Sequence, residues 1–376
     1  MERDLIARIQ RLAGAPIKDH SVLVSIGDDC AVLAPNPDHH LIITTDTLVE
    51  SIHFDLDYFN PWHLGRKTAA VNLSDAAAMG GNPRWAFLNL AVRPGLTDRF
   101  WDNFSKGLLS RLSEYGVSLV GGDTVSAPDR LSLSLTLIGE IKKGKWLSRS
   151  RAQPDDLIYC SGNLGEAAAG LELLRKYKKR KNPFKGRKGT HGISKAILKR
   201  LTNKHLDPEP CVTLGQALAA NGMVQTAIDV SDGIATDLAH ICKNSRVGAE
   251  IWAREMPVSR ALKRTARMLG ISPLDLALTG GEDFELLWTV SEKNESEVRN
   301  IAAKILGYRP FRIGKIVRGD SVILKTSQGS KDITYQGYEH HSRGAADARR
   351  RVRRRTPCTS SARQQSRCGA LVNAYR

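Results

Sequence analysis

The spacing of apolar and polar residues in the first part of the chain predicts two strands and two helices. Residues 41–49 (LIITTDTLV) have the composition of a strand. Residues 131–137 (LSLSLTL) alternate apolar and polar side chains without a break, the period of a strand with one buried face. Between them, the Ala-rich stretch 65–79 and the three- and four-residue apolar spacing over 100–115 indicate helices.

The second part of the chain continues with short strands and helices. Residues 156–160, 227–230 and 284–290 read as strands, and 234–245 reads as a helix. The elements show no regular βαβ period, and no G-x-G-x-x-G fingerprint is present. This pattern favours an α+β fold over a Rossmann fold.

The length of 376 residues and the 41% hydrophobic content suffice for two domains with buried cores. We expect an N-terminal domain over 1–150 and a C-terminal domain over 151–342. No stretch approaches the roughly 20 apolar residues that span a bilayer. The charged segment 1–12 does not read as a secretory signal, so a cytoplasmic protein without membrane contact is expected.

The net charge of +17 is concentrated in two segments. Residues 175–204 carry +13 and residues 343–376 carry +9, which leaves −5 for the rest of the chain. The lysine-rich insert 176–192 is expected to be a solvated loop, and the Arg-rich tail 343–376 to be disordered. Nucleic-acid binding is therefore expected only as weak, non-specific contact through the tail.

Acidic residues recur beside Gly, Ser or Thr. Taken singly, each such segment reads as a turn. Several occupy places where a plain turn does not belong: Asp46 lies inside an apolar run, Asp75 shares a helix face with Asn72, and Asp229 ends a strand. The full set of segments is GDD (27–29), TTDT (44–47), NLSD (72–75), GGDT (121–124), DVSDG (229–233) and GGED (280–283).

Buried carboxylates are costly unless a cation compensates them, so these acids predict converging metal ligands. The ligand atoms are oxygens and no two cysteines form a C-x-x-C pair, which points to Mg²⁺ before Zn²⁺. Magnesium held by several carboxylates is typical of sites that bind phosphates. Glycines allow the backbone to approach a phosphate closely. The residues thus predict a magnesium-dependent enzyme that acts on a polyphosphate and lacks a P-loop.

In order and rough spacing, the motifs GDD, TTDT, NLSDAAAMG, GGDT, DVSDG and GGEDFE resemble those of thiamine-monophosphate kinases. The resemblance covers about residues 1–340. These kinases share a superfamily with aminoimidazole ribonucleotide synthetase and selenophosphate synthetase. The resemblance implies a two-domain α+β fold of that type, a homodimer whose N-terminal sheets form a barrel, and a C-terminal α/β domain. It also implies ATP and several Mg²⁺ ions in the cleft between the domains.

The same resemblance assigns site residues, and some alternatives remain open. Arg151 competes with Arg149 for the phosphates of ATP, and His53 also fits an ordinary surface histidine. The alignment is weakest at Tyr338. The implied metal ligands are Asp29, Thr44, Thr45, Asp46, Asp75, Asp123, Asp229 and Asp232; the ATP contacts are Gly122, Asp123, Arg149 and Ser231; the thiamine monophosphate contacts are His53, Glu282 and Tyr338.

The implied reaction transfers the γ-phosphoryl group of ATP to the phosphate of thiamine monophosphate. The second pKa of a phosphate monoester is about 6, so the attacking oxygen is ionised at neutral pH. No residue is needed as general base or covalent nucleophile.

Two rival functions remain from the sequence. One is a sister enzyme that activates an amide or a selenide. Cys30 follows the first acidic motif, whereas selenophosphate synthetases place their nucleophile before it. The other is a nucleic-acid-binding protein that uses the basic insert and tail.

Overall fold

The computed structural model describes residues 8–9, 11–12, 20–24, 32–177 and 193–339. Asp29 with its GDD motif, most of the basic insert and the Arg-rich tail lie outside the described residues, so the expectations for them stay predictions. All elements below belong to one compact unit, Met1–Tyr338.

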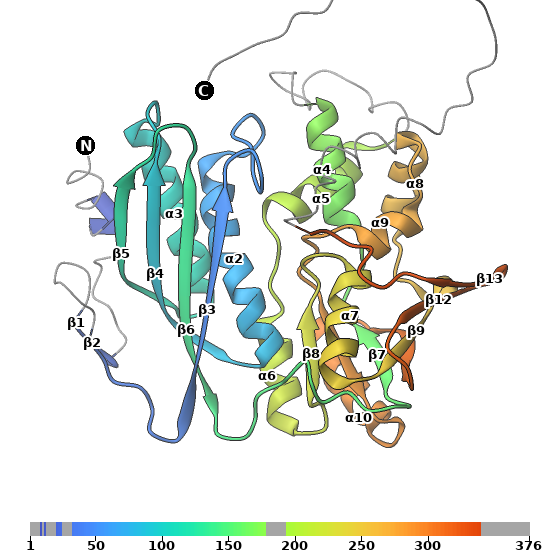
Figure 1. Cartoon of the computed structure of the whole chain (residues 1–376). Helices are drawn as coiled ribbons and strands as arrows, with labels where there is room; N and C mark the ends of the chain where they lie inside the picture. The colour runs from blue at the N-terminus through green and yellow to red at the C-terminus, as the bar shows by residue number, and fades with distance from the viewer. Residues whose placement is uncertain (1–7, 10, 13–19, 25–31, 178–192, 340–376) are drawn as a thin grey trace, which may run out of the picture. The chain divides into compact units, whose positions relative to one another are not determined.

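A four-stranded sheet, here called the first sheet, dominates the part of the chain before residue 150 (Figure 1). Its outer strand β3 pairs antiparallel with β6, β6 pairs antiparallel with β4, and β4 pairs parallel with β5. Leu133, Leu135 and Leu137 of β6 are fully buried on the face that α2 and α3 cover. The strands are β3 (His39–Val49), β6 (Ser132–Lys142), β4 (Asn82–Val92) and β5 (Ser118–Ser126), and the helices are α2 (Pro61–Met79) and α3 (Asp98–Glu114). A short hairpin, β1 (Val22–Val24) and β2 (Val32–Leu33), precedes them.

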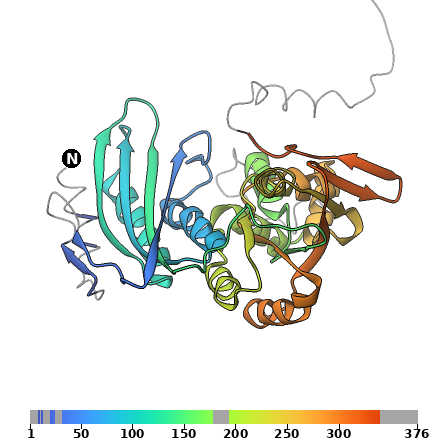
Figure 2. The same ribbon diagram turned by 60° about the horizontal axis from the view of Figure 1, so that its bottom comes forward.

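Helix α2 is central to the arrangement. The Asn60 side chain caps its first turn by accepting from the His63 N–H, and Pro61 occupies the first helical position. Gly80 ends the helix in the left-handed conformation, with φ of 74°. Apolar residues on nearly every side of α2 are buried, because the helix packs on the first sheet and also on α6 and β8 (Figure 2).

A seven-stranded sheet, the second sheet, follows after residue 150, in the order β13-β12-β9-β11-β7-β10-β8. All its pairings are antiparallel except β12 with β9. Its strands are β7 (Leu157–Cys160), β8 (Thr226–Asp229), β9 (Gly248–Trp252), β10 (Leu286–Val290), β11 (Phe311–Val317), β12 (Val322–Thr326) and β13 (Gly329–Asp332). The helices are α4 (Glu166–Tyr177), α5 (Lys195–Leu206), α6 (Val212–Asn221), α7 (Ile234–Ser245), α8 (Arg260–Leu269), α9 (Pro273–Thr279) and α10 (Glu295–Leu306).

Ion pairs connect the two parts. The guanidinium of Arg111 on α3 contacts Asp207 at 2.6 Å and Glu209 at 2.7 Å, and Arg66 on α2 contacts Asp207 at 2.8 Å. Both carboxylates lie in the connection between α5 and α6.

The expected α+β architecture is confirmed, whereas the sequence pattern failed to indicate β4 and β5. No helix in the described part of the chain is long and apolar enough to cross a membrane.

Candidate active site

Strand β3 and helix α2 bring the first group of acidic residues together. Alternate residues of β3 face α2, among them Thr44 and Asp46. The Thr44 hydroxyl donates to the Asp75 carboxylate, and the Asp46 backbone N–H donates to the Asn72 side chain at 3.1 Å. Because Asn72 and Asp75 are three residues apart on α2, one face of the helix holds both contacts.

The second sheet contributes another carboxylate to the same place. Asp229 ends β8 and is only 2% exposed. Its Oδ2 accepts a hydrogen bond of 2.8 Å from the Ser74 hydroxyl of α2. Asp232 lies three residues further on, where its backbone N–H donates to Asp237. Asp46, Asp75 and Asp229 therefore approach one another from three different elements.

Burial and mutual repulsion disfavour the charged forms of these acids. Burial, followed by the neighbouring charges of Asp75, Asp229 and Asp232, raises the pKa of Asp46 to about 7. Burial and the charge of Asp75 raise the pKa of Asp229 to about 7 as well. Burial also raises the pKa of Asp75. A hard divalent cation would relieve both penalties, so the donor set fits Mg²⁺.

This cluster is not a complete metal site by itself. Within the described residues, no three His, Cys, Asp or Glu side chains form a group arranged to hold a metal ion. Asp29, one of the ligands that the sequence suggests, lies outside those residues. Magnesium often keeps several waters and uses substrate phosphates as further ligands, which suits a partial protein shell.

Gly122 and Asp123 lie away from the cluster. They belong to β5, the opposite edge of the first sheet from β3, and both are exposed. The pairing registers place Gly122 in one row with Leu88, Leu135 and Asp46. Three strand spacings separate the ends of that row, which is roughly 14 Å. Within one chain, Asp123 is therefore not brought together with Asp46.

Thr45 points to the other side of the first sheet. Its neighbours Thr44 and Asp46 face α2, and the Thr45 hydroxyl instead accepts from Thr136 at 3.1 Å on the exposed face. The side chain of Thr45 is thus not brought together with the Asp46 cluster.

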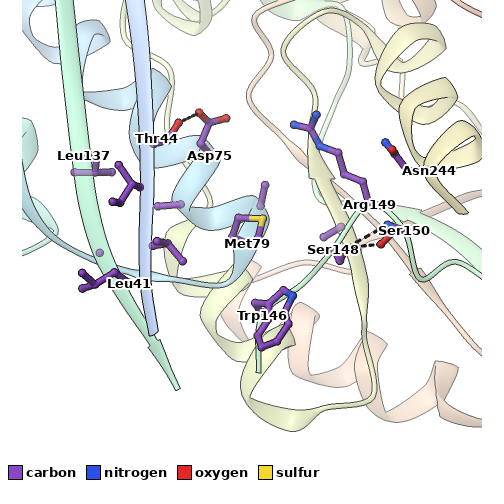
Figure 3. Close-up of a pocket in the computed structure, with 16 residues that line it drawn as sticks. Leu41, Thr44, Asp75, Met79, Leu137, Trp146, Ser148, Arg149, Ser150 and Asn244 are labelled. Atoms are coloured by element: carbon purple, nitrogen blue, oxygen red, sulfur yellow. Dashed lines mark hydrogen bonds between the residues drawn. The ribbon is translucent and has the colours of Figure 1, made fainter. Parts of the chain in front are cut away.

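A cavity of about 620 Å³ adjoins the cluster. Thr44 and Asp75 line one part of it, and Trp146 lines another (Figure 3). Most of the remaining wall is apolar, while Ser148, Arg149, Ser150 and Asn244 add polar groups. Such a volume with few polar groups is typical of a small-molecule site. The apolar lining includes Leu41, Ile42, Ile43, Ala76, Ala78, Met79 and Leu137.

The structure distinguishes the two candidate arginines. The exposed side chain of Arg149 projects into the region between Asp75 and Asn244 (Figure 3). Its charge acts on Asp75 and Asp229, whose pKa values it lowers against the dominant effect of burial. Arg151 instead lies over the ring of Trp146, 4.9 Å from the centroid, and donates to the Trp146 carbonyl. Arg149 is the better placed to meet an anion beside the cluster.

Ser231, Glu282 and Tyr338 are neighbours through their backbones. The Glu282 N–H donates to the Ser231 carbonyl at 2.7 Å, and the Tyr338 N–H donates to the Asp232 carbonyl at 2.9 Å. The Tyr338 residue is 46% exposed, so its ring is accessible. Three distant motifs thus meet at the loop that follows β8.

His53 lies in the turn after β3. Its Nδ1 accepts a hydrogen bond of 3.0 Å from the Val49 N–H, which leaves the ring proton of the neutral side chain on Nε2.

Sequence reasoning missed Lys67, Ser74 and Trp146. Lys67 lies between Arg66 and Thr68, so its neighbours in the sequence did not mark it as a buried cation. Ser74 and Trp146 carried no signal either.

The fold and the acidic cluster define the class to which the chain belongs, the AIR synthase related proteins. The N-terminal domain of that family matches residues 27–141, and the C-terminal domain matches residues 153–326. Within that class, the chain belongs to the thiamine-monophosphate kinase family.

Individual relatives support this membership. The thiamine-monophosphate kinase of Buchnera aphidicola subsp. Schizaphis graminum is 39% identical over 326 residues, which cover 86% of this chain and 94% of that protein. The crystal structure of the Stenotrophomonas maltophilia enzyme matches with a TM-score of 0.74 at 36% identity, covering 85% and 96% of the two chains. A structure of AaThiL complexed with AMPPCP and TMP matches with a TM-score of 0.67 at 28% identity, covering 88% and 96%.

Proposed function

We propose that this chain transfers the γ-phosphoryl group of ATP to thiamine monophosphate and forms thiamine diphosphate. One observation carries the proposal: Asp46, Asp75 and Asp229 form a crowded, desolvated cluster of carboxylates. Asp75 of this cluster lines a cavity of about 620 Å³ that Arg149 also lines. A cation-dependent phosphoryl transfer explains both features. The kinase relatives and the complex of AaThiL with AMPPCP and TMP support the choice of substrates.

In this proposal the cavity holds the nucleoside, and the phosphates extend toward Asp75. Trp146 and Met79 provide apolar surface for the base, and Arg149 pairs with a phosphate. Asp46, Asp75, Asp229 and Asp232 would hold Mg²⁺. The bound ions would neutralise the repulsion between the two polyanions and align the attacking and leaving oxygens.

The acceptor would approach from the side of Glu282 and Tyr338, while Ser231 would contact ATP. The phosphate oxygen of the acceptor is already ionised at neutral pH, so Glu282 and Tyr338 need only to bind and orient it. His53 would be a further contact of the acceptor. We infer direct transfer, with no phosphorylated enzyme.

A homodimer would bring Asp123 of one copy close to the acidic cluster of the other copy. Strands β3 and β5 are the open edges of the first sheet. If the sheets of two copies close into a barrel with β3 beside β5 of the partner, Gly122 and Asp123 of one copy come next to Asp46 of the other. Each site would then combine acidic residues from two chains.

Mixed dimers test this arrangement. Asp46→Asn and Asp123→Asn chains, each inactive alone, should regain activity when they are unfolded together and refolded as a mixture. Random pairing makes half of the dimers mixed, each with one intact site, so about a quarter of the wild-type activity is expected. A mixture that stays inactive although mixed dimers form would show that each site uses Asp123 of its own chain.

The substrate assignment is tested by assaying ATP-dependent phosphorylation of thiamine monophosphate and of free thiamine. We expect turnover of the monophosphate alone, because thiamine offers only a neutral hydroxyl with a far higher pKa. The rate should fall below about pH 6, where the second proton returns to the phosphate. Efficient phosphorylation of free thiamine would require a general base and would refute the direct mechanism.

A further inference from the structure

Lys67 is a buried cation in the middle of α2. Its side chain is completely inaccessible to solvent. The ammonium group contacts Oε1 of Glu282 at 2.8 Å, donates to the His205 carbonyl at 3.2 Å, and lies 5.3 Å from the ring centroid of Phe59. A buried ammonium without a counter-charge is strongly unfavourable, so Glu282 stabilises Lys67 in this position.

Glu282 is held in an unusual conformation. Its backbone φ of 66° lies in the left-handed region, which costs a residue other than glycine about 1 kcal/mol or more. Its side chain is 26% exposed, so a ligand can reach the carboxylate. His205 Nδ1 lies 3.0 Å from Oε2, outside hydrogen-bond geometry.

The charge of Glu282 is balanced within the protein. Burial would raise the pKa of Glu282, but the charge of Lys67 holds it well below its usual range. Burial and Lys67 both lower the pKa of His205, which is therefore neutral. Lys67 carries one positive charge and Glu282 one negative charge. The pair therefore has no net charge, and the Glu282 carboxylate stays ionised.

Helix α2 connects this pair to the acidic cluster. Lys67 and Ser74 are seven residues apart, so they lie on the same side of the helix, about 10 Å apart along its axis. Lys67 contacts Glu282, and Ser74 contacts Asp229. Both partners come from beyond residue 150, so a single rigid helix sets the spacing between the acceptor contact and the proposed metal ligands.

We propose that Lys67 is a positioning residue for the acceptor: it fixes the ionised Glu282 carboxylate in the orientation that binds thiamine monophosphate. The inference rests on the proposed function and deepens it, since Lys67 itself touches no substrate. Without Lys67, the Glu282 carboxylate would take up a proton or turn toward solvent. Either change would weaken acceptor binding and leave the ATP cavity intact.

Steady-state kinetics of four variants test the proposal: Lys67→Met, Glu282→Gln, the double variant, and Arg111→Met as a matched control. Arg111 is also a buried cation that joins the two parts of the chain, but its partners are Asp207 and Glu209. Lys67→Met should raise the KM for thiamine monophosphate at least about tenfold and change the KM for ATP less than about twofold. The control should change neither constant beyond twofold, whatever it does to stability.

The double variant separates positioning from general stabilisation. Once Glu282 is Gln, Lys67 has no carboxylate to orient, so the double variant should bind thiamine monophosphate no more weakly than Glu282→Gln alone. Its melting temperature should exceed that of Lys67→Met, because no unpaired carboxylate is left buried. If Lys67→Met does not fold, Lys67→Gln, which keeps a donor for the His205 carbonyl, takes its place.

Two results would overturn the proposal, and they are distinguishable. A wild-type chain that neither binds nor phosphorylates thiamine monophosphate refutes the proposed function and this inference with it. The second result is a wild-type enzyme with the expected activity whose Lys67 variants bind ATP and thiamine monophosphate equally weakly, or in which the effect of the Lys67 substitution adds fully to that of Glu282→Gln. The proposed function would then stand, and Lys67 would have only a structural role.

Discussion

Replacing Asp229 with Asn should inactivate the enzyme and at the same time stabilise the metal-free protein. Asp229 is 2% exposed, and burial beside Asp75 raises its pKa from 3.8 to about 7. Keeping it ionised in the folded chain without a cation therefore carries a penalty of at most about 4 kcal/mol. An Asn side chain avoids this penalty, and its oxygen still accepts the hydrogen bond from Ser74.

The sign of the pH dependence follows from the raised pKa. Between pH 3.8 and about 7, Asp229 binds more protons in the folded protein than in the unfolded chain. The penalty is therefore absent well below pH 3.8, grows as pH rises, and is complete above about pH 7. The stabilisation by Asp229→Asn should be about 4 kcal/mol at most at pH 8 and only about 1 to 2 kcal/mol at pH 5.

The assay is thermal unfolding in a chelator at pH 8 and pH 5, repeated at pH 8 with Mg²⁺, together with turnover. We expect a melting temperature several degrees above wild type in the chelator at pH 8, with a smaller difference at pH 5. Mg²⁺ should stabilise the wild type more than the variant. A turnover within about tenfold of wild type, a barrier change below about 1.4 kcal/mol, would remove Asp229 from the ligands. A variant that is less stable than wild type at pH 8 would contradict the charge argument.

Two further predictions concern the ATP site and the tail. Arg149→Met should raise the KM for ATP about tenfold, since it removes a charge beside the phosphates, whereas Arg151→Met should change this KM little. If Arg151→Met raises the KM for ATP more than Arg149→Met does, Arg151 and not Arg149 contacts the phosphates. Deleting residues 343–376 should leave kcat unchanged and weaken any salt-sensitive retention on DNA, and loss of activity on truncation would place the tail in the catalytic unit.

Local periodicity predicted the elements that have one regular face. The helix expected at 234–245 coincides with α7, and the strand expected at 41–49 is β3 with two more residues at its start. Strand β5 was missed because its GGDT motif suggests a turn. Gly122 has a φ of 152°, and a Cβ there would lie 1.9 Å from the Leu88 carbonyl oxygen. The glycine is needed where β5 approaches β4, and a single sequence does not reveal that packing.

The chemistry of the site was more predictable than its geometry. Carboxylates inside apolar segments indicated a cation site, and the structure brings Asp46, Asp75 and Asp229 together. The two-residue period of a strand could also have separated Thr45 from its neighbours, since adjacent side chains of a strand point to opposite faces. The position of Asp123 at the far edge depends on strand order, which no local pattern specifies.

The polar residues of α2 also specify how the fold is assembled. This helix is buried on nearly all sides, so its apolar surface alone would tolerate a slip by one turn, about 5.4 Å, between the two sheets. Such a slip would remove the partners that four polar side chains of the helix have on other elements, and each orphaned group would cost about 1 to 3 kcal/mol or more. The residues that build the site therefore also select the register in which the helix packs. The contacts that would be lost are Lys67 with Glu282, Asn72 with the Asp46 N–H, Ser74 with Asp229, and Asp75 with Thr44.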